Sequence, residues 1–344
     1  MSSGREGPVG PVVGLDLGGT KIAAALVAAD GTVLARHTRP TPATEGARAV
    51  LDALAAAATA VASGASSRVS SGVASRALSG VSSGVSSGVS SGAEVTAEFT
   101  AVGVAAAGVI DPVSGTVTGA TDTISGWRGT PLAPALAARL GTPVACDNDV
   151  RATAGPELAA LPPGSSLLYL AVGTGIGGAV AVDGRMAHGN SGVAGHIGHL
   201  PSPEAEGVPC SCGAVGHLEA VAAGPGITAL YERLSARRAE RLQTVADHAD
   251  RGDAAAAQAI AVGARAAGRA LGGLANALGP DRVVVGGGVT GLGPRYLGPL
   301  ADAFTAELLP PLEQLRPEPP RFGADAAVRG AALLTSTAPL HTPA

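Results

Sequence analysis

Two glycine-rich turns, each set between two apolar runs with strand character, constrain the fold of this chain more than any other feature. The first is D-L-G-G-T-K, at 16–21, and the second is G-T-G-I-G-G, at 173–178. Glycine lets a backbone approach an anion closely and present N–H groups to it. Because a strand rather than a helix follows each turn, neither matches a P-loop or a dinucleotide-binding fingerprint. One such turn is equally consistent with an ordinary hairpin, but two that face each other would hold a polyphosphate from both sides.

Carboxylates accompany the first turn and a later strand. Asp16 lies inside an apolar run, where an unpaired buried carboxylate is costly, and a Mg²⁺ ion carried by a nucleotide would give it a partner. Asp147, Asn148 and Asp149 follow another short apolar run. Asp149 could take a proton from a substrate hydroxyl, and Asn148 could bind a sugar hydroxyl as donor and acceptor. Taken alone, the D-N-D turn is better explained as a helix N-cap.

Cysteine and histidine gather in one short stretch. Cys210 and Cys212 stand between His199 and His217, with glycines that permit tight turns between them. Four ligands of this kind favour a closed, structural Zn²⁺ site, and the alternative is that each side chain is buried or solvated separately. Cys146 is the remaining cysteine of three. This usage indicates a reducing, cytoplasmic setting without disulfides.

Composition narrows the class of protein. The chain has 344 residues, which favours two lobes, and 46% of them are hydrophobic but only 2% aromatic, so the core is built from aliphatic side chains. The net charge is −4 without a basic stripe, which argues against a nucleic-acid partner. We identify no apolar run long enough to span a bilayer and no secretory signal in residues 1–11, so no membrane partner is expected.

Strand-like and helix-like segments alternate along the chain, which predicts an α/β fold. Strands are expected around 11–17, 22–27, 32–36, 99–110, 143–147, 166–173, 179–182 and 283–285, and helices around 45–62, 150–161, 250–278 and 324–335. Gly155 and Pro156 are expected to interrupt the second of these helices. Residues 63–92 form a degenerate S-S-G-V repeat, which we interpret as a mobile surface insertion.

Together these motifs resemble the ROK family of sugar kinases and repressors over nearly the whole chain. D-L-G-G-T-K and G-T-G-I-G-G resemble the two phosphate hairpins of the family, and D-N-D resembles its E-N-D catalytic turn. G-H-I-G-H followed by C-S-C-G-A-V-G-H-L-E resembles the zinc signature, and V-V-V-G-G-G-V resembles the glycine turn on the adenosine side. The resemblance implies a two-lobed actin-like ATPase (ribonuclease H-like) fold with a zinc-stabilised loop.

The resemblance also implies how the chain is divided and what it binds. The small lobe would be 1–121, with the insertion at 63–92 and a C-terminal helix at 324–337 packing back on it, and the large lobe would be 122–323 with the zinc site. The implied ligands are ATP, Mg²⁺, a structural Zn²⁺ and a sugar. Members of the family are often homodimers, so a homodimer is expected.

The implied roles fall on residues that match the family motifs. Asp149 would be the general base, and the sugar would be held by Asn148, Asp149, His196, His199, Glu219 and Gly108. ATP would be held by Asp16, Gly18, Gly19, Thr20, Lys21, Gly173, Thr174, Gly175, Gly177, Gly178, Gly287 and Gly288. The zinc ligands would be His199, Cys210, Cys212 and His217.

Several positions depart from the family pattern. His217 replaces a usual Cys, Arg151 a frequent Asn, and Ala107 a common Pro, while Thr121, Asp122 and Thr123 stand where a sugar-binding Asn is frequent. His196 replaces the Glu of most ROK hexokinases and resembles the A-G-H-I-G-H string of bacterial N-acetylmannosamine kinases. The favoured interpretation is an ATP-dependent 6-kinase for N-acetylmannosamine, which belongs to sialic acid catabolism. The alternatives are a glucokinase, an N-acetylglucosamine kinase and, less favoured because no helix-turn-helix precedes Asp16, a sugar-responsive repressor.

Overall fold

The computed structural model describes residues 10–77 and 98–343 of the chain, which forms two compact units. The first unit is Met1–Pro156 with Ala324–Ala344, and the second is Glu157–Gly323. The first unit extends beyond residue 121, where the sequence suggested that the small lobe ends. The reason is that the strand ending at Asn148 pairs in parallel with the first sheet, and the helix that begins at Asp149 follows it directly.

The first unit is built on a mixed five-stranded sheet of order β3-β2-β1-β4-β7. Strands β1 (Val12–Leu17), β2 (Lys21–Val27) and β3 (Val33–Pro40) form an antiparallel meander, as the turn signals predicted. β4 (Val102–Ala106) pairs parallel with β1, and β7 (Val144–Asn148) pairs parallel with β4. The carboxyl ends of β1, β4 and β7 therefore lie at one edge of the sheet. A separate hairpin is formed by β5 (Val109–Asp111) and β6 (Thr116–Gly119).

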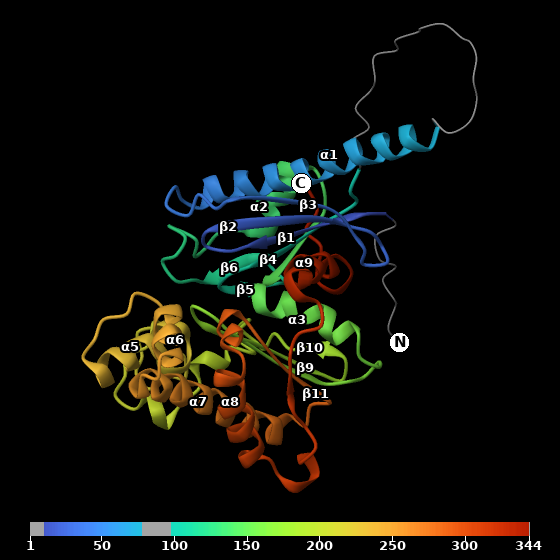
Figure 1. The fold of residues 1–344 in the computed structure, drawn as a ribbon. Coiled ribbons are helices and arrows are strands. Elements are labelled where there is room, and N and C mark those ends of the chain that lie inside the picture. The colour runs from blue at the N-terminus through green and yellow to red at the C-terminus, as the bar shows by residue number, and fades with distance from the viewer. Residues whose placement is uncertain (1–9, 78–97, 344) are drawn as a thin grey trace, which may run out of the picture. The chain divides into compact units, whose positions relative to one another are not determined.

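Helices cover both faces of this sheet (Figure 1). α1 (Ala47–Ala77) and α2 (Leu132–Leu140) share one core with the sheet. α3 (Asp149–Ala159) and α9 (Ala326–Thr337) cover the other face, so the last helix of the chain packs on its first strands. Gly14 and Gly103 make this close approach possible, because a Cβ at either position would overlap a carbonyl oxygen of α9.

Two expectations about helices are corrected. The backbone at 63–77 continues α1 instead of forming coil, since extending a helix is less costly than nucleating one and the segment contains alanine as well as serine and glycine. The rest of the expected insertion, 78–92, lies outside the described residues. Pro156 lies inside α3 rather than interrupting it. The carbonyl of Ala152, which a proline cannot bond, lies instead against Gly330 of α9.

One described segment, Ala47–Gly64, has the length and hydropathy of a membrane-spanning helix. Leu54, Ala57 and Val61 on this segment are buried in the core of the first unit against the sheet. Ala47–Gly64 is therefore part of a core helix of the first unit.

The second unit repeats the sheet topology of the first. Its strand order is β10-β9-β8-β11-β12, with the first two pairings antiparallel and the last two parallel. The strands are β8 (Leu167–Val172), β9 (Ile176–Val182), β10 (Arg185–Met186), β11 (Arg282–Gly286) and β12 (Pro317–Glu318). The two glycine-rich turns occupy the same place in the two sheets, β1–β2 and β8–β9.

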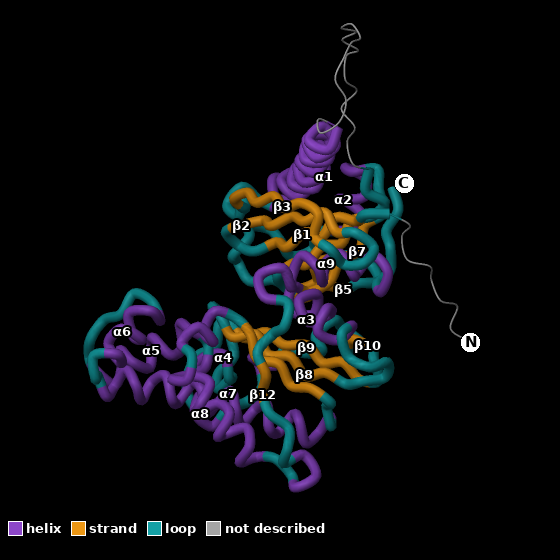
Figure 2. Tube along the Cα trace, turned by 45° about the vertical axis from the view of Figure 1, so that its right-hand side comes forward, coloured by secondary structure: helices purple, strands orange, loops and turns teal. Residues whose placement is uncertain are grey.

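A layer of helices accompanies the second sheet and is drawn purple in Figure 2. It consists of α4 (Glu219–Ala222), α5 (Gly224–Ser235), α6 (Leu242–Asp250), α7 (Ala254–Leu278) and α8 (Pro294–Glu307). α7 and α8 form the main helix pair, and Gly268 lets them approach because a Cβ there would meet the backbone of Leu300. Buried alanine, valine and leucine side chains of these helices form one core with β8 and β11.

Candidate functional site

The first glycine turn is held in a tight hairpin at the edge of the first sheet. The Gly18 amide donates to the Lys21 carbonyl at 3.0 Å, and the Thr41 hydroxyl donates to the Gly18 carbonyl at 2.7 Å. A Cβ at Gly19 would lie 2.5 Å from a methyl carbon of Thr123, so this position has no room for a side chain. Thr20 and Lys21 are exposed. The turn can therefore offer backbone amides and the Lys21 ammonium to the same ligand.

Asp16 and Asp149 bring two carboxylates to this same edge. Asp16 is the penultimate residue of β1, and Asp149 begins α3 directly after β7. Burial and the like charge of Asp149 raise the pKa of Asp16 to about 6, while Lys21 opposes the rise. A carboxylate in this position gains from a bound cation, so a Mg²⁺ ion fits the donor set of this edge.

Asn148 both caps a helix and holds the side chain of Asp149. Its side-chain oxygen accepts from the amides of Val150 at 3.0 Å and Arg151 at 3.2 Å, which is the N-cap role that the sequence alone favoured. Its amide nitrogen donates to the Gly108 carbonyl at 3.0 Å and to Asp149 Oδ1 at 2.8 Å. Asn148 therefore fixes the orientation of the Asp149 carboxylate.

A buried ion pair lies beneath the same turn. Arg151 Nε donates to Asp147 Oδ1 at 2.8 Å, and both side chains are almost fully buried. The guanidinium also reaches the carbonyl of Ile110 at 3.4 Å. Arg151 was noted from the sequence only as a departure from the family. The ion pair joins strand β7 to helix α3, so the helical i to i+4 rule does not predict it.

The second glycine turn lies beside the turn that follows β11, and both belong to the second unit. The Gly173 amide donates to the Gly175 carbonyl at 2.9 Å. Gly287 has φ +92°, and a Cβ there would lie 2.6 Å from the amide nitrogen of Val172. Only glycine fits this contact, which sets Gly287 against the end of β8.

A cavity of about 560 Å³ opens next to the β11 turn. Its lining comes from α6 and from the residues after that turn: Gln243, Ala246, Asp250, Gly291, Leu292, Pro294 and Arg295. Arg295 pairs with Asp250 at 2.5 Å and donates to the Ala246 carbonyl at 3.2 Å. Sequence analysis identified Gly287 and Gly288 but missed this lining, because helix α6 is brought to the turn only by tertiary packing.

His196 and His199 lie on the segment that follows the β9–β10 hairpin. Their rings are stacked with centroids 6.4 Å apart. Nδ1 of His196 lies 3.0 Å from the Val193 carbonyl oxygen, and since a carbonyl only accepts, Nδ1 carries the hydrogen. Nε2 is then the acceptor nitrogen of the neutral ring.

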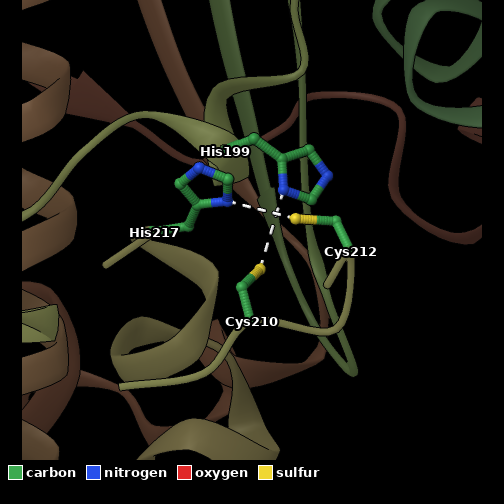
Figure 3. Close-up of side chains that lie close together, drawn as sticks. All are labelled: His199, Cys210, Cys212 and His217. Atoms are coloured by element: carbon green, nitrogen blue, oxygen red, sulfur yellow. Dashed lines mark hydrogen bonds between the residues drawn. The ribbon is translucent and has the colours of Figure 1, made fainter. Parts of the chain in front are cut away.

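The predicted metal ligands converge (Figure 3). One ligand atom from each of His199, Cys210, Cys212 and His217 lies within 4.8 Å of the others. Nδ1 of His199 is 3.8 Å from Sγ of Cys210, and Nδ1 of His217 is 3.2 Å from Sγ of Cys212. Ligand atoms around a tetrahedral zinc are about 3.3 to 3.8 Å apart, so the group needs only a small contraction to hold one.

Two glycines make this convergence possible. Gly213 and Gly216 have φ +91° and +86°, and the loop closes with the Cys210 amide bonded to the Ala214 carbonyl at 2.8 Å. Cys146 takes no part, since burial raises the pKa of its thiol to about 12 in the core of the first unit.

Glu219 lies between this loop and the second glycine turn. Its Oε2 accepts from the Ile176 amide at 2.8 Å, and its Oε1 accepts from the Ser211 hydroxyl at 2.5 Å. The family resemblance implied that Glu219 contacts the sugar, and Ser211 was not among the predicted site residues.

The predicted site residues thus form two groups. Asp16, the first glycine turn, Gly108, Asn148 and Asp149 gather at one sheet edge of the first unit. The second glycine turn, Gly287, Gly288, His196, His199, Glu219 and the cysteines belong to the second unit. The two mixed sheets have the same topology, and each has a glycine turn in the hairpin between its first two long strands, β1–β2 and β8–β9. These features define the class as an α/β protein built from a duplicated sheet.

The particular family follows from comparison with known proteins. The model of the ROK family matches residues 12–82 and 79–338, and the chain belongs to this family. It is similar to an N-acetylmannosamine kinase from Escherichia coli (strain SMS-3-5), with 31% identity over 85% of this chain and 87% of that protein. It is also similar to a glucokinase from Halalkalibacterium halodurans, with 34% identity over 61% and 67%.

A solved structure agrees with this assignment. A ROK family glucokinase from Streptomyces griseus, in complex with glucose and AMPPNP, matches with a TM-score of 0.71 and 28% identity over 94% of this chain and 99% of that one. The fold is therefore that of ROK sugar kinases, the actin-like ATPase fold.

Proposed function

We propose that this ROK protein is an ATP-dependent 6-kinase for an N-acetylhexosamine, with N-acetylmannosamine preferred. The coarser activity, ATP-dependent phosphorylation of a sugar, is supported by the similarity to both glucokinases and N-acetylmannosamine kinases. The observation that carries the proposal is the position of Asp149, which follows β7 at the sheet edge that also holds Asp16 and the first glycine turn.

Asp149 acts as the general base. Its carboxylate takes the proton of the sugar 6-hydroxyl, and the oxygen then forms a bond to the γ-phosphorus of ATP as the bond to the ADP oxygen breaks. Asn148 holds the carboxylate through the 2.8 Å contact to Oδ1. The glycine turns supply amide donors to the transferring group, and Lys21 supplies positive charge. Asp16 would hold a Mg²⁺ ion brought by the nucleotide, and this ion would supply positive charge to the phosphates.

The nucleotide base and ribose are assigned to the cavity beside the β11 turn. A volume of about 560 Å³ is in the range of small-molecule sites, and the lining combines apolar groups with the polar side chains of Gln243, Asp250 and Arg295. Gly291 and Leu292, which line the cavity, follow Gly287, and Gly287 lies against Val172 at the end of β8, just before the second glycine turn.

The family motifs assign sugar contacts to Asn148 and Gly108 in the first unit and to His196, His199 and Glu219 in the second. Because Nδ1 of His196 is bonded to Val193, the neutral ring would accept a hydrogen bond from the sugar. An acetamido N–H at C2 is a suitable donor for that acceptor, and so is a hydroxyl. The stated preference for N-acetylmannosamine rests on His196 and on the similarity to N-acetylmannosamine kinases.

The Cys/His cluster is assigned to a structural Zn²⁺. Four protein ligands fill a tetrahedral site and leave no position for a substrate, so this ion would order the loop that carries His199 and Glu219.

A glucokinase is the second candidate, favoured by the 34% identity to the H. halodurans enzyme. A panel of N-acetylmannosamine, N-acetylglucosamine, glucose and mannose, compared by kcat/KM with ATP, separates the two. We expect the highest value for N-acetylmannosamine. A higher value for glucose would replace the amino-sugar assignment, and no transfer to any of the four would reject the proposed function. His196→Glu is the matched variant, and it should shift the preference toward glucose.

A further inference from the structure

Helix α6 forms one wall of the cavity that is assigned to the nucleoside part of ATP. Gln243, Ala246 and Asp250 of this helix line the cavity. Their spacing of three and four residues places them on one face of α6. His248 stands two residues from Ala246 and from Asp250, and since a helix turns by about 100° per residue, it lies on the opposite face. A contact that holds His248 therefore orients the cavity face of the helix.

A buried tyrosine hydroxyl makes that contact. Tyr231 is fully buried on α5, which lies beside α6 (Figure 1). Its hydroxyl oxygen lies 2.5 Å from Nδ1 of His248 and 3.3 Å from Oδ2 of Asp253. Asp253 is the N-cap of α7, where its Oδ1 accepts from the Ala255 and Ala256 amides. One hydroxyl thus connects α5 with the end of α6 and the start of α7.

The direction of each hydrogen bond in this network follows from its acceptor. The bond from the Ala256 amide, foremost, lowers the pKa of Asp253, so its side chain is a carboxylate that only accepts. The Tyr231 hydroxyl donates its one hydrogen to this carboxylate, and its oxygen then accepts from Nδ1–H of His248. The hydroxyl is satisfied as donor and as acceptor, and its removal would cost both bonds.

The cavity face of α6 is held by a weaker contact. Arg295, at the start of α8, pairs with Asp250 at 2.5 Å and donates to the Ala246 carbonyl at 3.2 Å. The side chains of Arg295 and Asp250 are 36% and 61% exposed, and ion pairs so open to solvent contribute little. The buried bonds of Tyr231 are therefore the stronger constraint on where α6 places Gln243 and Asp250.

We propose that Tyr231 is a positioning residue that holds α6 through His248 and thereby sets the affinity of the cavity for the nucleoside part of ATP. It acts through the helix and is not part of the lining that the described residues form. The identity of the ligand rests on the proposed function, whereas the network is a property of the folded second unit. A tyrosine that only stabilised the fold would alter sugar and nucleotide binding alike, or neither. A positioning residue alters nucleotide binding alone.

The test uses four variants of the full chain. Tyr231→Phe removes the hydroxyl and keeps the ring, and His248→Ala removes its partner. His248→Asn keeps a donor, because an amide nitrogen can replace Nδ1–H. Tyr296→Phe is the matched control, since Tyr296 is equally buried in the second unit and its hydroxyl has no hydrogen-bond partner among the described residues.

The first measurement is amide hydrogen exchange over 242–250 without any ligand. We expect faster exchange in Tyr231→Phe and His248→Ala, and near-normal exchange in His248→Asn and Tyr296→Phe. The second is the Kd for ADP by calorimetry in the absence of sugar, which should rise about 3- to 10-fold in Tyr231→Phe and His248→Ala. In steady-state kinetics the KM for ATP should rise by a similar factor in these two variants, while kcat and the KM for the sugar stay within about twofold.

The outcomes separate this inference from the proposed function. Unchanged exchange over 242–250 in Tyr231→Phe would overturn the positioning role, whatever the enzyme phosphorylates. Faster exchange with an unchanged Kd for ADP would overturn the effect on the cavity, and so would an equal rise of the Kd in Tyr296→Phe. Absence of ADP binding by the unaltered protein would reject the proposed kinase reaction and, with it, the ligand named here, and the exchange data would still decide whether Tyr231 holds α6.

Discussion

Asp16 and Asp149 lie at the carboxyl ends of β1 and β7, on either side of β4, and the pKa of Asp16 is raised by burial and then by the charge of Asp149. Two carboxylates that are close together and partly buried repel each other, so this edge of the sheet favours binding of a cation or a proton. The first two predictions concern this pair.

Asp149→Asn should lower kcat by about 10² to 10⁴-fold, because the amide cannot accept the proton of the sugar hydroxyl. The Kd for the sugar should stay within about threefold, since the amide keeps the size of the carboxylate. Steady-state kinetics and calorimetry provide the measurements, and Asp30→Asn, on the turn between β2 and β3, is the control. Turnover near that of the unaltered protein would remove Asp149 from the role of base.

Asp16 makes folding dependent on pH in a defined direction. Its pKa is about 6 in the folded protein against an ordinary 3.8, so the folded state binds the proton more tightly. The contribution of Asp16 to stability is therefore fully present below pH 4, is lost as the pH rises from 4 to 6, and does not change further above that range. Asp16→Asn removes this loss and should stabilise the protein at pH 7.5 by about 2 kcal/mol, although it should also abolish turnover.

Urea unfolding at pH 4, 5, 6 and 7.5 measures this difference. Asp52→Asn, which alters a surface carboxylate of α1, should show no such dependence. A difference between Asp16→Asn and the unaltered protein that stays constant from pH 4 to 7.5 would contradict the elevated pKa.

Gly291→Leu tests the nucleotide cavity. A Cβ at Gly291 meets no atom within 4 Å, so the longer side chain can enter the cavity without disturbing the fold. The KM for ATP should rise about tenfold or more, because the side chain takes the volume assigned to the base. The KM for the sugar should not change. An effect on the sugar alone would show that the cavity does not hold the nucleotide.

Cys210→Ser tests the metal assignment. The purified unaltered protein should contain equimolar zinc, and the variant should lose it and melt about 5 to 10 °C lower, because a closed site contributes directly to folding. Zinc content by elemental analysis and a thermal melt suffice. Cys146→Ala should keep its zinc, since this thiol lies in another core. A metal-free protein with an unchanged melting temperature would argue that the four side chains associate without an ion.

Gly330→Ala tests the close contact between α9 and α3. A Cβ at Gly330 would overlap the Ala152 carbonyl, and neither backbone can withdraw easily, so the variant should lose about 2 to 4 kcal/mol. Gly273→Ala in α7 is the control, because a Cβ there meets nothing and alanine favours the helix. Equal stability of the two variants would mean that α9 can shift away from α3.

Most of the site could be predicted from local sequence signals. The turns at Gly18 and Gly173, the Asn148 cap and the cysteine loop each depend on a few adjacent residues, and the structure places them in the expected turns. The first three strands of the first sheet could be predicted equally well, since apolar runs separated by turn residues determine the meander.

The remainder depends on packing between distant segments. The contacts of Glu219 with Ser211 and Ile176 join three segments whose order in the chain does not reveal their proximity. Helices α2, α5 and α8 were not assigned. α1 continued past Ser63 because extending a helix costs less than nucleating one. α3 continued through Pro156 because its backbone packs against Gly330 of α9, so tertiary contact outweighed propensity there.

The placement of α9 has a consequence for biosynthesis. The strands from Val12 to Asn148 leave the ribosome early, yet the helix that covers one face of their sheet is Ala326–Thr337. Residues 157–323 can fold as soon as they emerge, whereas the earlier half must wait with β1 and β4 partly uncovered. The part of the polypeptide that is translated first is thus completed last, and a nascent chain arrested before residue 326 would be a natural client for chaperones.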